Sequence, residues 1–204
     1  MIGLLIKDFS IVKKQVKIAA VMLFFAAVWA FYEKDATMFA YMSVLFGFFL
    51  PLTAIGYDER SQWNKYALCM PLKKSYLVTS KYILGFLTIS ISVIVFYLIT
   101  LLINSNLSLD QVQVGLAILS GGMIFLSIYL PICFRFGTEK ARYMIITISF
   151  MPTTIILILK KLNLLSEPKE ETLLLLVQLL PIIGLFIVFL SVMISIQVIK
   201  NKEY

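Results

Sequence analysis

The side chains best able to do chemistry lie together between Gly56 and Tyr82, in a polar stretch flanked by two long apolar runs. The stretch holds seven charged residues, together with Trp63 and Cys69. Such groups suit docking or transmission of motion. Catalysis needs in addition a base, a nucleophile or a bound cofactor, each placed in a recognisable pattern.

No such pattern is present. The chain has no histidine, which excludes every mechanism that uses imidazole as base, relay or metal ligand. Cys69 and Cys133 do not form a zinc-binding pattern, and we interpret both as reduced structural thiols. The motifs G-x-x-x-x-G-K-[ST], GxSxG, HExxH and CxxC are all absent. We therefore expect no catalytic residue, no metal site and no ATP hydrolysis by this chain itself.

The composition indicates what must position the polar stretch. The chain is 61% hydrophobic with a mean hydropathy of +0.96, whereas soluble domains are about 45 to 50% apolar. Its apolar residues form runs of about 20, which is the length needed to span a bilayer. We predict an all-α integral membrane protein, a single transmembrane domain over residues 1–204, with six spans: Ile18 to Tyr32, Ala36 to Ile55, Ile83 to Ile103, Val112 to Phe134, Tyr143 to Leu159, and Leu173 to Ile199.

These runs contain almost no ionisable side chains. An intramembrane enzyme is thereby excluded, and a proton- or sodium-coupled carrier is disfavoured, because such carriers use embedded charged residues. The small and hydroxylated residues in the runs indicate close helix packing, although some of them could instead line a pathway.

The distribution of positive charge predicts the orientation. If the N-terminus is cytoplasmic, only Lys34, Lys160, Lys161 and Lys169 of the 18 lysines and arginines fall outside. This bias predicts a multi-pass membrane protein with both termini in the cytoplasm. It also explains the basic composition without a nucleic-acid partner.

Residues 1–17 alternate apolar and basic positions at helical spacing. This pattern predicts an amphipathic elbow helix that lies in the headgroup layer, with lysines on anionic lipid. The alternative is a charged tail that precedes the first span. The expected apolar stripe includes Leu5, Phe9 and Val12, and the basic side includes Lys13 and Lys14.

Within the polar stretch, Asp58, Glu59 and Arg60 follow the second span, where the acidic pair could cap a following helix or pair with Arg60. Ser61 to Met70 places Trp63, Tyr66, Ala67 and Met70 at helical steps, which predicts a short helix with an aromatic face. Pro71 ends it, and a second helix is expected to run from Leu72 through Lys81 into the third span. An interfacial loop that only packs on headgroups is the alternative.

The last run, Leu173 to Ile199, is longer than a bilayer requires and contains Pro181. Either this helix tilts, or residues 173–180 form a separate outer segment. We favour the break. Whether residues 160–180 form a re-entrant outer gate stays open.

The order of these features, with Leu68-Cys69-Met70-Pro71-Leu72 and Lys81-Tyr82 in the polar stretch, resembles the permease subunits of type-2 ABC exporters. The compact form is similar to permeases of small-peptide exporters, such as the bacterial phenol-soluble-modulin exporter, and of bacteriocin self-immunity. The resemblance implies that residues 56–82 form a cytoplasmic coupling and gating segment that docks on a separate ATPase. It implies contact residues at Asp58, Glu59, Arg60, Trp63, Tyr66, Leu68 and Met70, and hinge or gating residues at Pro71, Lys73, Lys74 and Lys81.

The resemblance further implies a membrane subunit that works as a homodimer or heterodimer, with ATP and Mg bound by the ATPase subunit and no cofactor in this chain. Because the spans carry so little charge, we expect an amphipathic or hydrophobic cargo, most simply a peptide. The alternative function is an ATP-independent membrane scaffold, immunity protein or small carrier.

Overall fold

The computed structural model describes residues 2–69, 73–104, 106–148 and 170–201, and these residues are helical apart from short connections. Five long helices dominate, and a short one, α3 (Trp63–Cys69), lies between the second and third of them. The long helices are α1 (Ile2–Glu33), α2 (Thr37–Arg60), α4 (Lys74–Asn104), α5 (Leu109–Phe136) and α7 (Glu170–Lys200). Residues 138–148 are also helical. The predicted all-α class is confirmed for the described residues.

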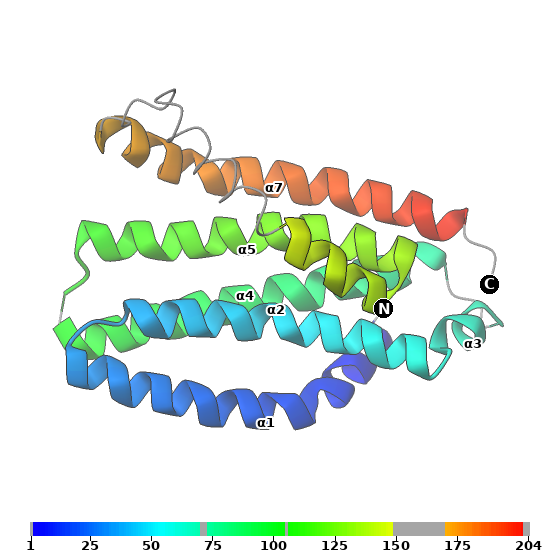
Figure 1. Cartoon of the computed structure of the whole chain (residues 1–204), viewed down its shortest axis with the longest axis horizontal. Helices are drawn as coiled ribbons and strands as arrows, with labels where there is room; N and C mark the ends of the chain where they lie inside the picture. The colour runs from blue at the N-terminus through cyan, green and yellow to red at the C-terminus, as the bar shows by residue number, and fades with distance from the viewer. Residues whose placement is uncertain (1, 70–72, 105, 149–169, 202–204) are drawn as a thin grey trace.

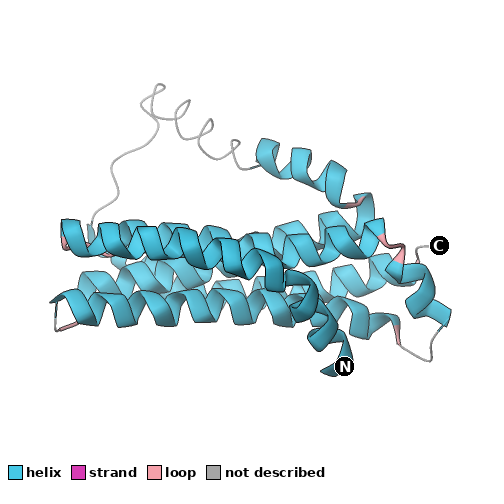
Figure 2. Ribbon diagram, turned by 90° about the horizontal axis from the view of Figure 1, so that it is seen from below, coloured by secondary structure: helices cyan, strands magenta, loops and turns pink. Residues whose placement is uncertain are grey.

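The long helices run side by side along one axis (Figures 1 and 2). The start of α1, the end of α7, α3 and the turn after α5 lie at one end of the bundle, and the connection 34–36 and the start of α5 lie at the other (Figure 1). The segments that the charge bias assigns to the inner side therefore share one end, which we call the terminal end.

Among the described residues, five helical segments are long and apolar enough to cross a membrane, namely Gln15–Glu33, Thr37–Arg60, Lys74–Asn104, Leu109–Phe136 and Gln178–Lys200. They match the predicted first, second, third, fourth and sixth spans. The predicted fifth span begins within the helix over residues 138–148, but most of it lies outside the described residues. The count of six spans stays a prediction.

The N-terminal segment is not a separate helix, since α1 continues without interruption from Ile2 to Glu33. Its first turns bend away from the remainder (Figure 1). Leu4, Asp8 and Val12 form the buried line, whereas Phe9 remains 63% exposed. The face toward the protein thus differs from the predicted apolar stripe and contains a carboxylate.

The last helix corrects a prediction. α7 is continuous through Pro181, so the expected break between residues 180 and 181 is wrong. Its 31 residues extend about 46 Å at roughly 1.5 Å per residue, against an apolar layer of about 30 Å. The helix must therefore tilt or project beyond that layer. Residues 160–169, which the gate prediction also includes, lie outside the described residues.

Small residues allow α2, α4 and α5 to pack closely, as the sequence predicts. Ser92 Oγ donates to the Ser43 carbonyl at 3.0 Å and Thr88 Oγ1 to the Gly47 carbonyl at 2.9 Å. A Cβ atom at Gly85 would lie 2.7 Å from Leu126 Cδ1. These contacts fix the position of α4, whose first residues belong to the polar stretch.

Candidate coupling region

Four charged side chains meet at the terminal end of the bundle: Lys7 and Asp8 from α1, Asp58 from α2 and Lys81 from α4. Lys81 Nζ lies 2.6 Å from Asp8 Oδ1 and 2.6 Å from Asp58 Oδ2. Lys7 Nζ lies 2.6 Å from Asp58 Oδ1 and 3.1 Å from Asp8 Oδ1. We call these four residues the ion-pair network.

The network is buried. Asp8, Asp58 and Lys81 are 1%, 5% and 4% exposed. Two cations and two anions compensate one another, which burial of charge requires. Loss of one partner would leave an uncompensated charge, so the network holds α1, α2 and α4 in one arrangement.

The network also reaches α3. Lys7 Nζ lies 4.6 Å from the centre of the Trp63 ring, a cation–π contact. Ala67 of α3 packs with Leu4 and Leu77 in a small buried cluster. The short helix is therefore attached to both α1 and α4.

Glu59 connects a different pair of segments. Its carboxylate accepts a hydrogen bond from the backbone N–H of Thr138 at 2.8 Å and another from the Thr138 hydroxyl. It thereby caps the helix over residues 138–148. The approach needs Gly137, whose φ is +85° and whose Cβ, if it had one, would lie 3.0 Å from Glu59 Oε1.

The other predicted contact residues fall in two groups. Arg60 and Tyr66 are exposed, and Trp63 is half-buried. The Leu68 side chain and all of Met70 lie outside the described residues. Asp58 faces inward, bound to two lysines of its own chain, so in this structure its carboxylate is not presented to a partner.

The predicted hinge residues are also spread out. Pro71 lies outside the described residues, and Lys73 is exposed. Lys74 Nζ donates to the carbonyls of Ile199 at 3.4 Å and Lys200 at 3.3 Å, the last carbonyls of α7. Lys81 belongs to the ion-pair network. Both helices predicted in the polar stretch are present: the short helix is α3, and the helix that runs into the third span is the start of α4.

The predicted elbow residues line different sides of the first turns. Val12 is buried, Leu5 is half-buried, and Phe9 and Lys13 are exposed. The Lys14 side chain is outside the description.

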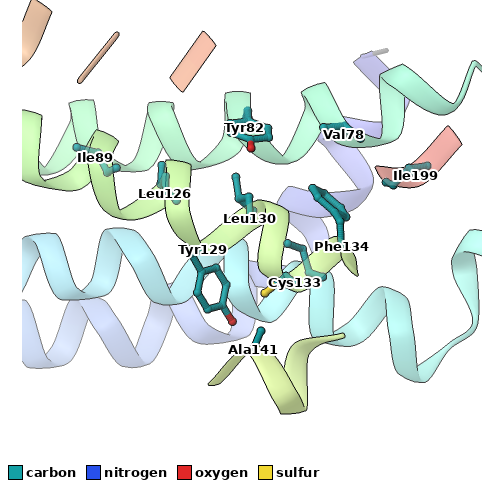
Figure 3. Packing of buried hydrophobic residues seen from close by; sticks show 11 residues of the cluster. Val78, Tyr82, Ile89, Leu126, Tyr129, Leu130, Cys133, Phe134, Ala141 and Ile199 are labelled. Atoms are coloured by element: carbon teal, nitrogen blue, oxygen red, sulfur yellow. The ribbon is translucent and has the colours of Figure 1, made fainter. Parts of the chain in front are cut away.

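A second set of polar contacts, a chain of hydrogen bonds that starts at Tyr82, lies next to the network on α4. The Tyr82 hydroxyl lies 2.5 Å from Ser191 Oγ and 2.8 Å from Ser195 Oγ, and Ser191 Oγ donates to the Ser127 carbonyl at 2.6 Å. Figure 3 shows Tyr82 within the buried cluster that also contains Leu126 and Leu130. These bonds tie α4 to α7 and α5 one residue beyond Lys81.

The family model described as "ABC-2 family transporter protein" matches residues 3–200. The chain belongs to the ABC-2 transporter family. Searches of curated proteins and of solved structures found no significant match. Membership identifies a multi-pass membrane permease of an ABC transporter and implies an ABC ATPase as its partner.

Sequence reasoning did not find the network or the Glu59 cap. Lys7, Asp8 and Lys81 look like ordinary juxtamembrane charges, because nothing in their local spacing shows that they meet across 51 or 73 residues of chain. The signal that could have found them is a pair of carboxylates at positions that face the interior on helical periodicity.

Proposed function

We propose that this ABC-2 permease exports an amphipathic or hydrophobic cargo, most simply a peptide, across the bacterial cytoplasmic membrane, driven by a separate ATPase subunit that binds ATP and Mg. The ion-pair network carries the proposal, because it connects the short helix α3, through Trp63, to three of the long helices. The positive charge at that end supports a cytoplasmic position for it and for both termini.

In this mechanism the ATPase contacts α3, whose Tyr66 is 63% exposed. Movement of α3 would act on Lys7 through Trp63 and on α4 through the cluster of Ala67 and Leu77. The polar chain at Tyr82 would pass the displacement to α5 and α7.

Glu59 offers a parallel route. A displacement at the end of α2 would act directly on the helix over residues 138–148 through the Thr138 hydrogen bonds. Two segments far apart in sequence would therefore respond together to one docking event.

The cargo assignment follows from the described parts of the spans, which offer no buried charged partner for a strongly charged molecule outside the network at the terminal end. A dimer, either of this chain or with a second permease, would place the cargo path between subunits. No nucleic-acid partner is required.

Co-purification with the partner ABC ATPase tests the docking surface. Tyr66→Ala should lower retention of the ATPase at least about tenfold, as expected for an aromatic side chain at the centre of an interface. Tyr41→Ala, at a tyrosine that is 60% exposed on α2, is the matched control and should retain it. If neither Tyr66→Ala nor deletion of residues 62–70 lowers retention, the ATPase docks elsewhere. Movement of peptide by the purified chain alone would favour an ATP-independent carrier.

A further inference from the structure

A groove of about 880 Å³ opens beside the coupling region, between α1, α2, α5 and the helix over residues 138–148. This volume is in the range of sites that hold small molecules. Its apolar wall includes Leu45, Phe49, Phe125 and Ile145, and its rim, where α2 ends, includes Arg60 and Arg142. The groove therefore has an apolar part within the spans and a charged part at the terminal end.

Tyr129 provides an independent sign of a missing partner. This residue lines the groove and is 3% exposed, yet its hydroxyl has no hydrogen bond of ordinary geometry with the described residues. The nearby thiol of Cys133 is a weak hydrogen-bonding group. In Figure 3 the hydroxyl points away from Leu130 and toward Ala141, on the helix that forms the other wall. A buried hydroxyl that faces only a weakly bonding thiol is poorly satisfied, and an occupant with an oxygen at this depth would improve its hydrogen bonding.

The rim favours an anionic group. Arg60 and Arg142 are exposed and form no ion pair with a described residue. The rim also carries two carboxylates, Glu59 and Glu139. The charge of Glu59 is offset by the two donors of Thr138 at a helix N-terminus. Two guanidinium groups then remain against the one carboxylate of Glu139, so the rim keeps a positive balance, and the planar arrays of guanidinium donors match the oxygens of a phosphate.

We propose that this groove binds a phospholipid of the leaflet at the terminal end, with its phosphate at Arg60 and Arg142, an oxygen of its glycerol region at Tyr129, and an acyl chain along Phe49, Phe125 and Ile145. The order of charged rim, buried hydroxyl and apolar wall follows the order of groups in a phospholipid entering from the headgroup layer. A helix of a second copy is the other occupant that could cover the apolar wall, and cross-linking distinguishes it from a lipid. The proposal does not depend on the identity of the cargo.

Native mass spectrometry of the full chain, purified in mild detergent and mixed with phosphatidylglycerol or phosphatidylethanolamine, tests the site. Both lipids carry the phosphate, so both should bind the wild-type chain. Arg60→Gln with Arg142→Gln should lower the bound phospholipid about tenfold, and Tyr129→Phe about threefold, since it removes one hydrogen bond. Arg135→Gln, an exposed arginine in the last turn of α5 outside the groove, is the control and should change nothing.

Equal binding by the wild type and the double arginine variant would overturn the proposal, as would an equal loss in Arg135→Gln. A photoreactive side chain at Ile145 distinguishes the occupants. A cross-link to phospholipid supports the proposal, whereas a cross-link to a second copy of the chain, or to added peptide in preference to lipid, overturns it.

Discussion

Lys81 Nζ lies 2.6 Å from Asp8 Oδ1, which joins the first turns of the chain to the start of α4 although 73 residues separate the two. The same ammonium group lies 2.6 Å from Asp58 Oδ2. A single lysine therefore bridges two buried carboxylates from two other helices, and Lys7 supplies the second positive charge. The start of α4 cannot move relative to α1 without disturbing this contact.

Lys81→Met should be one of the most damaging single substitutions at the terminal end. It removes a partner of both Asp8 and Asp58 while leaving both carboxylates buried, which costs about 3–5 kcal/mol for a buried pair. Thermal unfolding in detergent measures the loss. Lys73→Met, at an exposed lysine, should leave the unfolding temperature unchanged.

The double variant Asp8→Asn with Lys81→Met gives a stricter measurement. Because it removes one charge of each sign, it should be more stable than Lys81→Met alone. Additive losses would show that the two residues do not interact as the distance indicates.

Glu59 and Thr138 should show coupling in a double-mutant cycle. Glu59→Gln weakens the acceptor and Thr138→Val removes the hydroxyl donor, so the combined loss should be smaller than the sum by about 1–3 kcal/mol. Glu139→Gln on the same helix is exposed and is the control. Equilibrium unfolding in denaturant measures the energies, and a coupling energy of zero would remove Glu59 from the proposed route to residues 138–148.

Much of the secondary structure could be predicted from the sequence, because membrane spans are set by length and apolarity. The start of α4 before its span was predictable from amphipathic periodicity that begins after Pro71. The continuity of α7 was not, because a proline in a membrane helix is tolerated when neighbouring groups compensate for the missing hydrogen bond. The sequence of residues 173–181 is compatible both with a continuous helix and with a helix broken at Pro181, so the sequence alone does not decide between them.

The site was less predictable than the spans. Asp58 and Lys81 were identified as important from their place in the polar stretch, but not as partners of each other. Their pairing depends on the packing of α1 against α2 and α4, and a single sequence contains no direct signal for contacts between distant segments. Glu59 illustrates the same limit, since its partner Thr138 is 79 residues away.

Tyr82→Phe should impair export more than assembly. The substitution keeps the buried ring and removes the hydroxyl that bonds Ser191 and Ser195. The stability loss should be about 1 kcal/mol, and retention of the ATPase should be unchanged because α3 is untouched. Tyr76→Phe, at a more exposed tyrosine of α4, is the matched control. Export from cells, measured beside ATPase retention, gives both values, and parallel loss of the two would assign Tyr82 a structural role only.

Gly85 should accept a larger residue poorly, because the side chains of Leu126 from α5 and Pro51 from α2 lie directly against it. A Cβ would lie 2.7 Å from Leu126 Cδ1 and 3.3 Å from Pro51 Cγ. Gly85→Ala should therefore cost about 1–3 kcal/mol from overpacking, even though alanine favours a helix. Gly121→Ala has open space around its Cβ and should be neutral or stabilise the helix by up to about 1 kcal/mol. Thermal unfolding of the two variants compares one chemical change at two sites of α4 and α5, and an equal response would mean that helix propensity rather than the contact decides their stability.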